Sequence, residues 1–412
     1  MPRVTLASPQ PKALAPLSSL SADSYTCRLH SQISELGADV WQAIAPPNFP
    51  FCDYRFLDAL ESSGSVAADT GWQPLHLSLW DSNERLVAAM PLYLKTDSYG
   101  EYIFDWSWAN AYARHCIPYY PKLVSAIPFT PATGPKLLGS APQALIKAAQ
   151  ALARKLDCSS LHLLFLDESE TTSAAAYDLP IRASYQFHWH NRGFADFAEF
   201  LASLRQKKRK EIRRERRLVS ELPLRIETLT GDALTPEHAQ IMYGFYLDTI
   251  SRKWATPYLT AAFFQTIFSS FREHIVLHLA FEESGEAIAG SIAFRKGNAL
   301  FGRYWGCSRI YPHLHFELCY YCGIDFAIAH GLERFEAGAQ GSHKVQRGFS
   351  PTVTRSAHWI AHPQFATAIA DFIADEEAAI VNEFEDSPDA YKTKAAAPSI
   401  AASPGGNSET RI

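Results

Sequence analysis

The alternation of apolar and polar residues predicts two β-hairpins that resemble each other. Residues 75–95 read LHLSLWDSNERLVAAMPLYLK and residues 277–296 read LHLAFEESGEAIAGSIAFRK. Each segment is an apolar strand, a polar turn and a second apolar strand, which is the signature of a β-hairpin. A further apolar run follows each hairpin, at residues 102–108 and at residues 299–307. We therefore expect a third strand in both places.

The similarity continues beyond these strands. Residues 142–156 are predicted to form a helix, because apolar side chains recur at positions 145, 149, 152 and 156 before the apolar run SSLHLLFL. Residues 317–330 precede LERFEAG in the same way, with four side chains predicted to face inward: Leu318, Tyr321, Ile324 and Ile328. The order strand, strand, strand, helix, strand thus occurs twice. This pattern predicts an α/β (α+β) protein built by duplication of one unit.

Composition divides the chain into domains, a connecting segment and two tails. Residues 1–20 are rich in Pro, Ser and Ala, and residues 386–412 are of low complexity, so both are predicted to be disordered. Residues 191–222 are predicted to form a connecting helix with an apolar front and a basic back. The two repeated units then occupy residues 21–190 and residues 223–385.

The basic part of the connecting segment is a candidate for phosphate binding. Nine of the thirteen residues at 205–217 are Lys or Arg, and the acidic residues among them are Glu211 and Glu215. One interpretation is a solvated linker helix. The other is a surface that binds a nucleotide-linked, lipid-linked or tRNA-borne substrate through its phosphates. The candidate contacts are Lys208, Arg209, Arg213 and Arg214.

Composition and charge restrict the class of protein. The chain has 412 residues, of which 47% are hydrophobic and 20% charged, as in globular proteins. Its net charge of −5 argues against a general nucleic-acid binder. Seven scattered cysteines indicate reduced thiols, and no apolar run is long enough for secretion or for a membrane span. We therefore expect a cytoplasmic protein without a transmembrane segment.

Several familiar site motifs do not fit this sequence. Some His and Cys residues lie close enough together to suggest a metal site, but their spacing is not that of a zinc ribbon: Cys307, His313, His315, Cys319 and Cys322. The cysteines stand among Leu, Tyr and Ile, as small apolar core residues do. The chain also has no GxxxxGK[ST], no strand–GxGxxG–helix and no GxSxG motif. No metal and no permanently bound cofactor are expected.

Polar residues gather after the predicted strand at 332–337. Five hydrogen-bonding side chains fall within twelve residues: Glu336, Gln340, His343, Lys344 and Arg347. Glu336 or His343 is a candidate general base for an amine. Lys344 or Arg347 is a candidate for holding a phosphate or stabilising an oxyanion. The alternative is a solvated loop at the end of a strand.

Longer motifs add a resemblance to a known family. They read YGEYIFDWSWANAY, FTPATGPKLL, YQFHWHNRGFADFAEFLASLRQKKRKEIRRER, FGRYWGC and HFELCYYCGIDFAIAHGLERFEAGAQGSHKVQRGFSP. Over about residues 25–385 the chain resembles the FemAB-like peptidoglycan biosynthesis/recognition proteins, also described as predicted N-acyltransferases. The resemblance implies two fused GNAT-like domains, which have the acyl-CoA N-acyltransferase fold. Each would be a mixed, mostly antiparallel sheet flanked by helices.

The resemblance also implies an activity. The related Fem peptidyltransferases move an aminoacyl group from a charged tRNA onto the amine of a peptidoglycan precursor. Their second domain opens with a basic segment similar to residues 205–217 and carries a lysine before a Gly-Phe pair, similar to residues 344–349. Here Arg347 stands directly before Gly348, which departs from that pattern. The segment YPHLHF likewise replaces the glycine-rich turn with which GNAT enzymes bind acyl-CoA.

Together these observations predict an acyl or aminoacyl transferase that acts on an amine, with acyl-CoA or aminoacyl-tRNA as a possible donor and a phosphate-bearing substrate. The predicted catalytic residues are Glu336, His343 and Arg347. Further substrate contacts are predicted at Lys344, Gln340, Arg303, His315 and Glu317, besides the four basic residues above. The alternatives are a non-catalytic binding protein for a cell-wall or lipid-linked ligand and an acetyl-CoA-dependent N-acetyltransferase.

Overall fold

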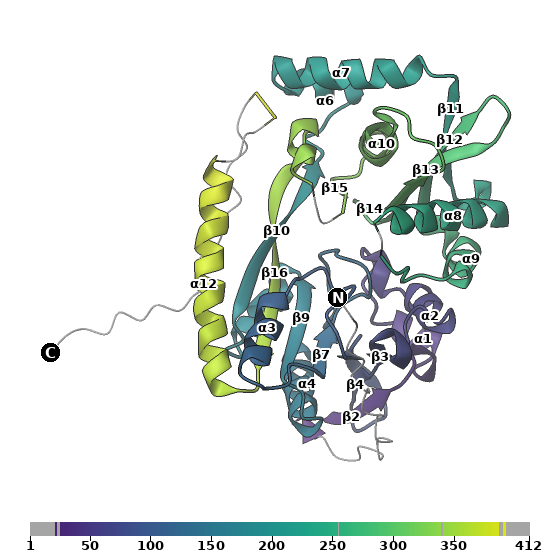
Figure 1. Ribbon diagram of the computed structural model, residues 1–412. Helices are drawn as coiled ribbons and strands as arrows, with labels where there is room; N and C mark the ends of the chain where they lie inside the picture. Colours follow the sequence, from purple (N-terminus) through teal and green to yellow (C-terminus); the bar gives the residue numbers. More distant parts are fainter. Residues whose placement is uncertain (1–20, 23–24, 254, 339–340, 387–389, 393–412) are drawn as a thin grey trace.

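The fold consists of two sheets and the helices that cover them. The computed structural model describes residues 21–22, 25–253, 255–338, 341–386 and 390–392. Most of the two predicted tails therefore lies outside the described residues. In Figure 1 the first half of the chain lies below, the second half lies above, and β10 and β16 run between them.

The smaller sheet belongs to the first half and contains the first predicted hairpin. Its order is β1-β2-β4-β5-β8, and all its pairs are antiparallel. The strands are β1 (Ser21–Ala22), β2 (Tyr25–His30), β4 (His76–Trp80), β5 (Leu86–Met90) and β8 (Leu138–Gly139). The hairpin predicted within residues 75–95 is confirmed as β4 and β5.

The larger sheet joins both halves in the order β11-β12-β13-β14-β15-β10-β16-β9-β7-β6-β3. Its strands are β3 (Trp72–Pro74), β6 (Tyr93–Lys95), β7 (Lys122–Ser125), β9 (Ser160–Leu166), β10 (Ile181–His190), β11 (Leu224–Thr230), β12 (Ile275–Glu282), β13 (Ala287–Lys296), β14 (Ala299–Cys307), β15 (Arg334–Glu336) and β16 (Ser350–Ile360). Among the described strands, β7–β9 and β14–β15 are parallel and the other pairs are antiparallel. The predicted second hairpin is confirmed as β12 and β13, and its following strand as β14. The expected mixed, mostly antiparallel α/β fold is therefore present, with one parallel pair in each half.

The third strand predicted at residues 102–108 is wrong. Residues 106–114 instead form helix α3 (Trp106–Arg114), which buries Trp108 and Tyr112 on one face. These aromatic residues are four positions apart, so they fit a helix as well as a short apolar strand would. The strands between α3 and α4 in the first unit are β7, which begins at Lys122, and the short β8.

The helices predicted in both units are present, but the second is irregular. Helix α4 (Pro142–Lys155) buries Leu145, Ala149 and Leu152 as expected. In the second unit, α10 (Leu314–Phe316) passes into a π-helix (Glu317–Tyr321) and then into α11 (Cys322–Ala329). Short π-helical segments are rare and frequently occur at functional sites.

The connecting segment forms two helices, α6 (Phe197–Ser203) and α7 (Gln206–Ser220), which meet at Leu204. At this break Leu204 forms a β-bridge with Tyr391. Helix α7 lies across the end of the second half (Figure 1). The remaining α-helices are α1 (Ala38–Gln42), α2 (Tyr54–Ser62), α5 (Glu168–Ala175), α8 (Pro236–Arg252), α9 (Ala261–Ser270) and α12 (Pro363–Asp386).

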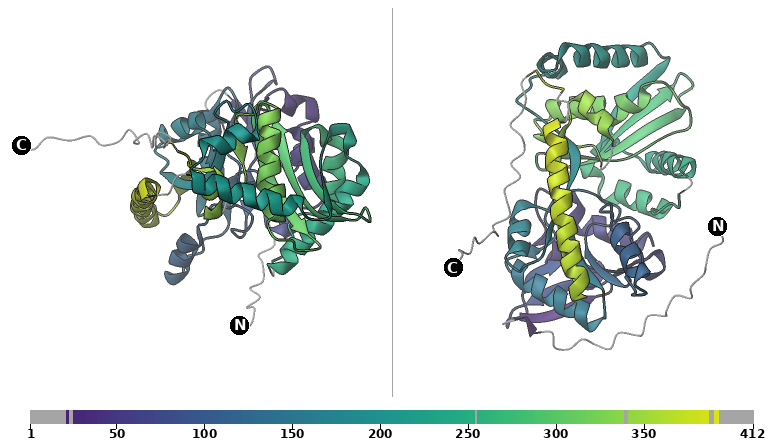
Figure 2. Two further views of the ribbon diagram at one scale, coloured as in Figure 1. Left: turned by 90° about the horizontal axis from the view of Figure 1, so that it is seen from above. Right: turned by 60° about the vertical axis from the view of Figure 1, so that its left-hand side comes forward.

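Two features hold the halves together. Strand β10 from the first half lies between β15 and β16, so the sheet is continuous across both halves, and α12 runs beside β10 and β16 (Figure 2). The halves also share an aromatic core: Phe51 packs edge-on against Phe301, and Phe56 packs edge-on against Phe294, with ring centroids 5.3 Å and 5.6 Å apart. Such contacts favour one fixed arrangement of the rings.

Candidate functional site

A cavity opens where the parallel strands of the second half diverge. Strands β14 and β15 are paired only from Ala299–Phe301 to Arg334–Glu336. Beyond Phe301, β14 continues to Cys307 beside β13, and no described strand pairs with its other edge. The cavity at this edge has a volume of about 540 Å³ and is lined by β14 residues from Gly302 to Trp305. Unpaired strand edges carry backbone groups that are free to bind a ligand.

Both halves of the chain contribute to the cavity. The second half provides Tyr246 and Lys253 from α8 and its end, together with Tyr320 from the π-helix. The first half provides the segment that joins β6 to α3, whose residues Ser98 to Trp106 form the opposite wall. The cavity is thus lined by aromatic side chains with polar groups between them, a composition typical of small-molecule sites.

Two of the predicted contacts, Arg303 and His315, line this cavity. A guanidinium nitrogen of Arg303 donates to the carbonyl oxygen of Phe129 in the first half. The ring of His315 packs edge-on against Trp305, with centroids 5.1 Å apart. Burial, and then the nearby charge of His343, lowers the pKa of His315 to about 4, so its imidazole is neutral at pH 7.

The predicted base His343 reaches the cavity through a tyrosine. Its Nε2 is hydrogen-bonded to the hydroxyl of Tyr320 at 2.8 Å, and Tyr320 lines the cavity. Burial and the charge of Arg347 lower the pKa of His343. Burial raises the pKa of Tyr320. At neutral pH this pair therefore consists of a protonated phenol and a neutral imidazole.

Lys344 is a buried cation with a single polar contact among the described residues. Its Nζ donates to the carbonyl oxygen of Gly338 at 2.7 Å, and Gly338 lines the cavity. The side chain forms no ion pair with another residue that the structure describes. Burial lowers the pKa of Lys344 to about 8. A buried amine without a counter-ion is costly and is a common property of functional lysines.

Arg347 and Glu317 are held by helix α7 rather than exposed to the cavity. Arg347 donates to Glu215 Oε1 at 2.7 Å and to the backbone oxygen of His343 at 2.9 Å. Glu317 accepts from Arg216 at 2.8 Å. Both contacts join the connecting segment to the site, so these two residues are placed to position their neighbours.

Glu336 lies behind the cavity wall. Its neighbours Phe335 and Ala337 line the cavity, whereas its carboxylate lies 2.9 Å from Arg334 Nε and 3.8 Å from His188 Nε2 of β10. Burial raises the pKa of Glu336 to about 7, although Arg334 partly offsets this effect. The structure therefore separates Glu336 from the His343–Lys344 group that the sequence placed beside it.

The predicted phosphate contacts of α7 lie apart from the cavity lining. Lys208 donates to Gln346 at 2.9 Å, Arg209 has a long contact to the Ala202 carbonyl, and Arg213 and Arg214 are exposed. The remaining predicted contact, Gln340, lies outside the described residues. Exposed basic residues recur along α7 as Lys207, Lys210, Arg213, Arg214 and Arg217, so the outer face of the helix is cationic.

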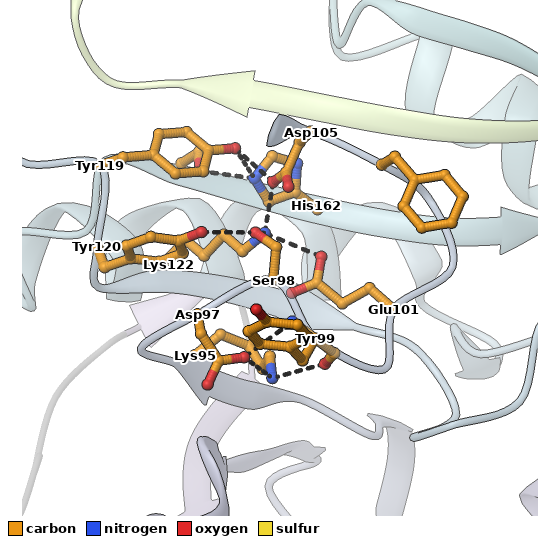
Figure 3. Close-up of polar contacts among 12 residues, drawn as sticks. Lys95, Asp97, Ser98, Tyr99, Glu101, Asp105, Tyr119, Tyr120, Lys122 and His162 are labelled. Atoms are coloured by element: carbon orange, nitrogen blue, oxygen red, sulfur yellow. Dashed lines mark hydrogen bonds and ion pairs between the residues drawn. The ribbon is translucent and has the colours of Figure 1, made fainter. Parts of the chain in front are cut away.

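Sequence reasoning missed a charged cluster buried in the first half. Lys122 of β7 donates to Ser98 at 2.8 Å, to Glu101 at 2.9 Å and to Asp105 at 2.5 Å (Figure 3). Tyr119 donates to Asp105 at 2.7 Å. Ser98 also lines the cavity, so this cluster fixes the cavity wall. The available signal is the lysine that begins the short, buried strand KLVS, because lysine is almost never fully buried unless it is paired.

The electrostatics of this cluster follow from burial and from one central cation. Burial raises the pKa of Glu101 to about 7, and Lys122 only partly offsets it. For Asp105 the charges of Lys122 and His162 outweigh burial and lower the pKa to about 2. Nearby, His162 Nδ1 and His358 Nδ1 are 2.6 Å apart, and burial lowers the pKa of both rings. These imidazoles are therefore neutral core residues at pH 7.

In the part of the chain that the structure describes, no group of three or more His, Cys, Asp or Glu residues is arranged to hold a metal ion. None of the described helices combines the length and apolar character needed to span a membrane.

Solved structures of similar shape include FemX, with 11% identity over 83% of this chain and 99% of that chain (TM-score 0.49). L-PGS from Bacillus licheniformis has 11% identity over 76% of this chain and 95% of that one (TM-score 0.45). A tandem GNAT protein from the clavulanic acid biosynthesis pathway has 13% identity over 82% and 98% (TM-score 0.42). Similarity at this level carries no argument about activity.

Family membership rests on the sequence itself. No curated protein sequence matches this chain. A family model described as peptidoglycan biosynthesis/recognition matches residues 32–393, which is most of the chain. This match agrees with the resemblance of the long motifs. The chain belongs to the FemAB-like family.

Proposed function

We propose that the protein is a transferase that moves an acyl or aminoacyl group onto an amine in peptidoglycan biosynthesis. The observation that carries this proposal is the Tyr320–His343 pair on the wall of the cavity between β14 and β15. A neutral base connected to a cavity through a hydroxyl is suited to remove a proton from an amine. Family membership supports the peptidoglycan context.

The unpaired edge of β14 supports binding of an extended substrate that contains amides. Beyond Phe301 the backbone groups on this edge have no partner strand among the described residues. An extended chain adds to such an edge through main-chain hydrogen bonds. The pantetheine arm of an acyl-CoA and a peptide stem both have suitable amides. Backbone N–H groups of the same edge are also suited to stabilise the oxyanion of a tetrahedral intermediate.

The proposed reaction is nucleophilic acyl substitution. The amine nitrogen attacks the thioester or ester carbonyl and forms the new C–N bond. Its proton passes to the oxygen of Tyr320 while the phenol proton passes to His343 Nε2. Collapse of the tetrahedral intermediate breaks the bond to the leaving group, which receives the proton back from His343.

The other predicted catalytic residues have supporting roles in this proposal. Arg347 is a positioning residue, because it donates to the backbone oxygen of His343 and is fixed by Glu215. Lys344 provides positive potential beneath Gly338, near the developing oxyanion. Glu336 is the second candidate base, behind the wall. Both possible donors, acyl-CoA and aminoacyl-tRNA, are cytoplasmic molecules, and we place the protein there.

The proposal is tested by measuring product formation by mass spectrometry with each donor and a peptidoglycan-precursor peptide as the amine acceptor. His343→Gln should lower kcat by about 100-fold or more, the usual contribution of a general base. Glu336→Gln should retain most activity. The opposite pattern would replace His343 by Glu336 as the base. Binding of the precursor without turnover, with either donor, would favour a non-catalytic binding protein.

A further inference from the structure

One end of the cavity gathers basic side chains. Lys253 and His315 line it there. The ring of His343 lies 6.4 Å from the ring of His315 between centroids. Lys344 and Arg347 follow in the same short helix, Ser342–Arg347. Burial has the largest effect on the pKa of His315, and the other four basic groups of this end each lower it further.

Few carboxylates balance the cations of this group, which are Lys253, Lys344 and Arg347, since both imidazoles are neutral. The carboxylate that faces this group is Glu215, which bonds Arg347 at 2.7 Å and lies 3.8 Å from His313. Lys253 forms no ion pair with any described residue. Among the residues that the structure describes, the cavity lining contains neither Asp nor Glu. The chain carries a net charge of −5, so this positive region is a local feature and not a reflection of composition.

The backbone here is poorly suited to hold an anion. A phosphate is commonly bound by free N–H groups at the start of a regular helix that follows a glycine-rich turn. Here α10 has only three residues before the π-helix begins. The preceding residue is His313, not glycine, at a positive φ of 67°. Side chains must therefore do what the backbone does in such loops.

We propose that this end of the cavity is a phosphoryl-binding subsite in which Lys253 and His315 contact the phosphate and Lys344 supplies a second cation. The inference rests on the proposed function and adds the place where a phosphate-bearing substrate is anchored. The lysine at the mouth provides an exposed point charge, and the imidazole provides an N–H donor. Helix α7, which carries the other basic residues, is not required for this contact.

Pyrophosphate is the probe for the subsite, measured by calorimetric titration of the full chain and by NMR of histidine-labelled protein. We expect saturable binding that moves the His315 ring signals. Lys253→Gln and His315→Gln should each weaken binding by about tenfold, which corresponds to about 1.4 kcal/mol. Lys253 is exposed and makes no ion pair within the described part of the chain, so its variant should fold normally. Lys210→Gln on the exposed face of α7 is the matched control and should bind as the wild type does.

Absence of pyrophosphate binding at millimolar concentration would overturn the proposal, and so would an equal loss in Lys210→Gln. Competition then identifies the source of the phosphate among coenzyme A, uridine diphosphate and a short RNA. Displacement of pyrophosphate by none of these three would also overturn it. Pyrophosphate binding without acyl transfer would refute only the proposed function. Acyl transfer without pyrophosphate binding would refute only the subsite.

Discussion

The parallel strand pairs of the two halves differ in whether the space beside them is open or filled. In the second half, β14 and β15 diverge and a cavity forms between them. In the first half, the segment that follows β7 folds back and is largely buried, as at Ile127 and Phe129. There Lys136 donates to the carbonyl oxygen of Phe165 in β9 at 2.6 Å. The space beside the parallel strand pair is therefore filled by the chain itself in the first half and left as a cavity in the second.

The first half also forms part of the cavity wall in the second half. The carbonyl oxygen of Phe129 accepts from Arg303, and Pro131 lines the cavity of the second half. A duplicated unit can thus lose its own cavity and become the wall of its partner's cavity. This explains why residues of the first half, such as Ser98 and Tyr102, belong to a site centred on the second.

Two buried lysines express the same difference. Lys122 in the first half is surrounded by carboxylates, and the charges of Glu101 and Asp105 outweigh burial, so its pKa is raised. Lys344 in the second half has a backbone carbonyl as its hydrogen-bond acceptor, and burial lowers its pKa to about 8. Lys122 therefore stabilises the fold through its ion pairs, whereas the buried charge of Lys344 lowers the free energy of unfolding. The same substitution should therefore have opposite effects at the two positions.

The largest expected effect is that of Lys122→Met. Removing this cation leaves Glu101 and Asp105 buried without their partner. Breaking a buried ion pair in this way typically costs about 3–5 kcal/mol, so we expect a loss of that size in the free energy of unfolding, measured by denaturant titration. The triple variant that also carries Glu101→Gln and Asp105→Asn should recover part of the loss. Wild-type stability in Lys122→Met would contradict the structural role of the cluster.

The second effect is a pH dependence at the seam between the halves. Burial raises the pKa of Glu336 to about 7, above its value in the unfolded chain. The folded protein keeps the Glu336 proton to a higher pH than the unfolded chain does, so it is most stable below the pKa that Glu336 has in the unfolded chain. As the pH rises from there to about 7, the free energy of unfolding falls by about 1.4 kcal/mol per pH unit. Glu336→Gln removes this loss, so it should match the wild type near pH 4 and exceed it by about 3 kcal/mol at pH 8. Equal stabilities at both pH values would contradict a buried carboxyl whose pKa is raised.

The third effect, that of Lys344→Met, has the opposite sign to Lys122→Met. A lysine whose pKa is lowered on folding costs stability below that pKa, because the unfolded chain binds the proton more tightly. Removing it should raise the free energy of unfolding at pH 7 by about 2 kcal/mol. The wild type should approach the variant as the pH rises above about 8. A loss of stability would mean that Lys344 has a counter-ion and is structural, like Lys122.

The sequence predicted more of the fold than of the site. Periodicity identified both hairpins and the helix α4, because each has a regular buried face. It failed at residues 102–108, where aromatic residues in a short run fit a strand and a helix equally well. The exchange of β10 and β16 between the halves depends on long-range pairing, which no local pattern encodes.

Within the site, closeness along the chain does not predict which side chains lie together. Glu336 and His343 are seven residues apart, yet the strand alternation of β15 turns the Glu336 side chain toward His188 and away from the cavity. Arg347 was expected to face a substrate, but a carboxylate from α7 holds it. The phenol of Tyr320 was not singled out, because one tyrosine among many carries no sequence signal. Such placements follow only from tertiary packing.

The smallest expected effect concerns the C-terminal segment at residues 390–392, which contacts the second half at Gly348. The hydroxyl of Tyr391 donates to the carbonyl oxygen of Gly348 at 2.8 Å, directly after the helix that carries His343 and Lys344. Tyr391→Phe should lower the free energy of unfolding by about 1 kcal/mol, the usual net value of a buried hydrogen bond. Tyr112→Phe is the control, because that buried hydroxyl has no hydrogen-bond partner among the described residues. If both variants lose the same stability, the contact with Gly348 is not what holds the segment in place. If only Tyr391→Phe loses stability, hydrogen exchange at residues 343–349 should also increase, because the hydrogen bond from Tyr391 to Gly348 stabilises this segment.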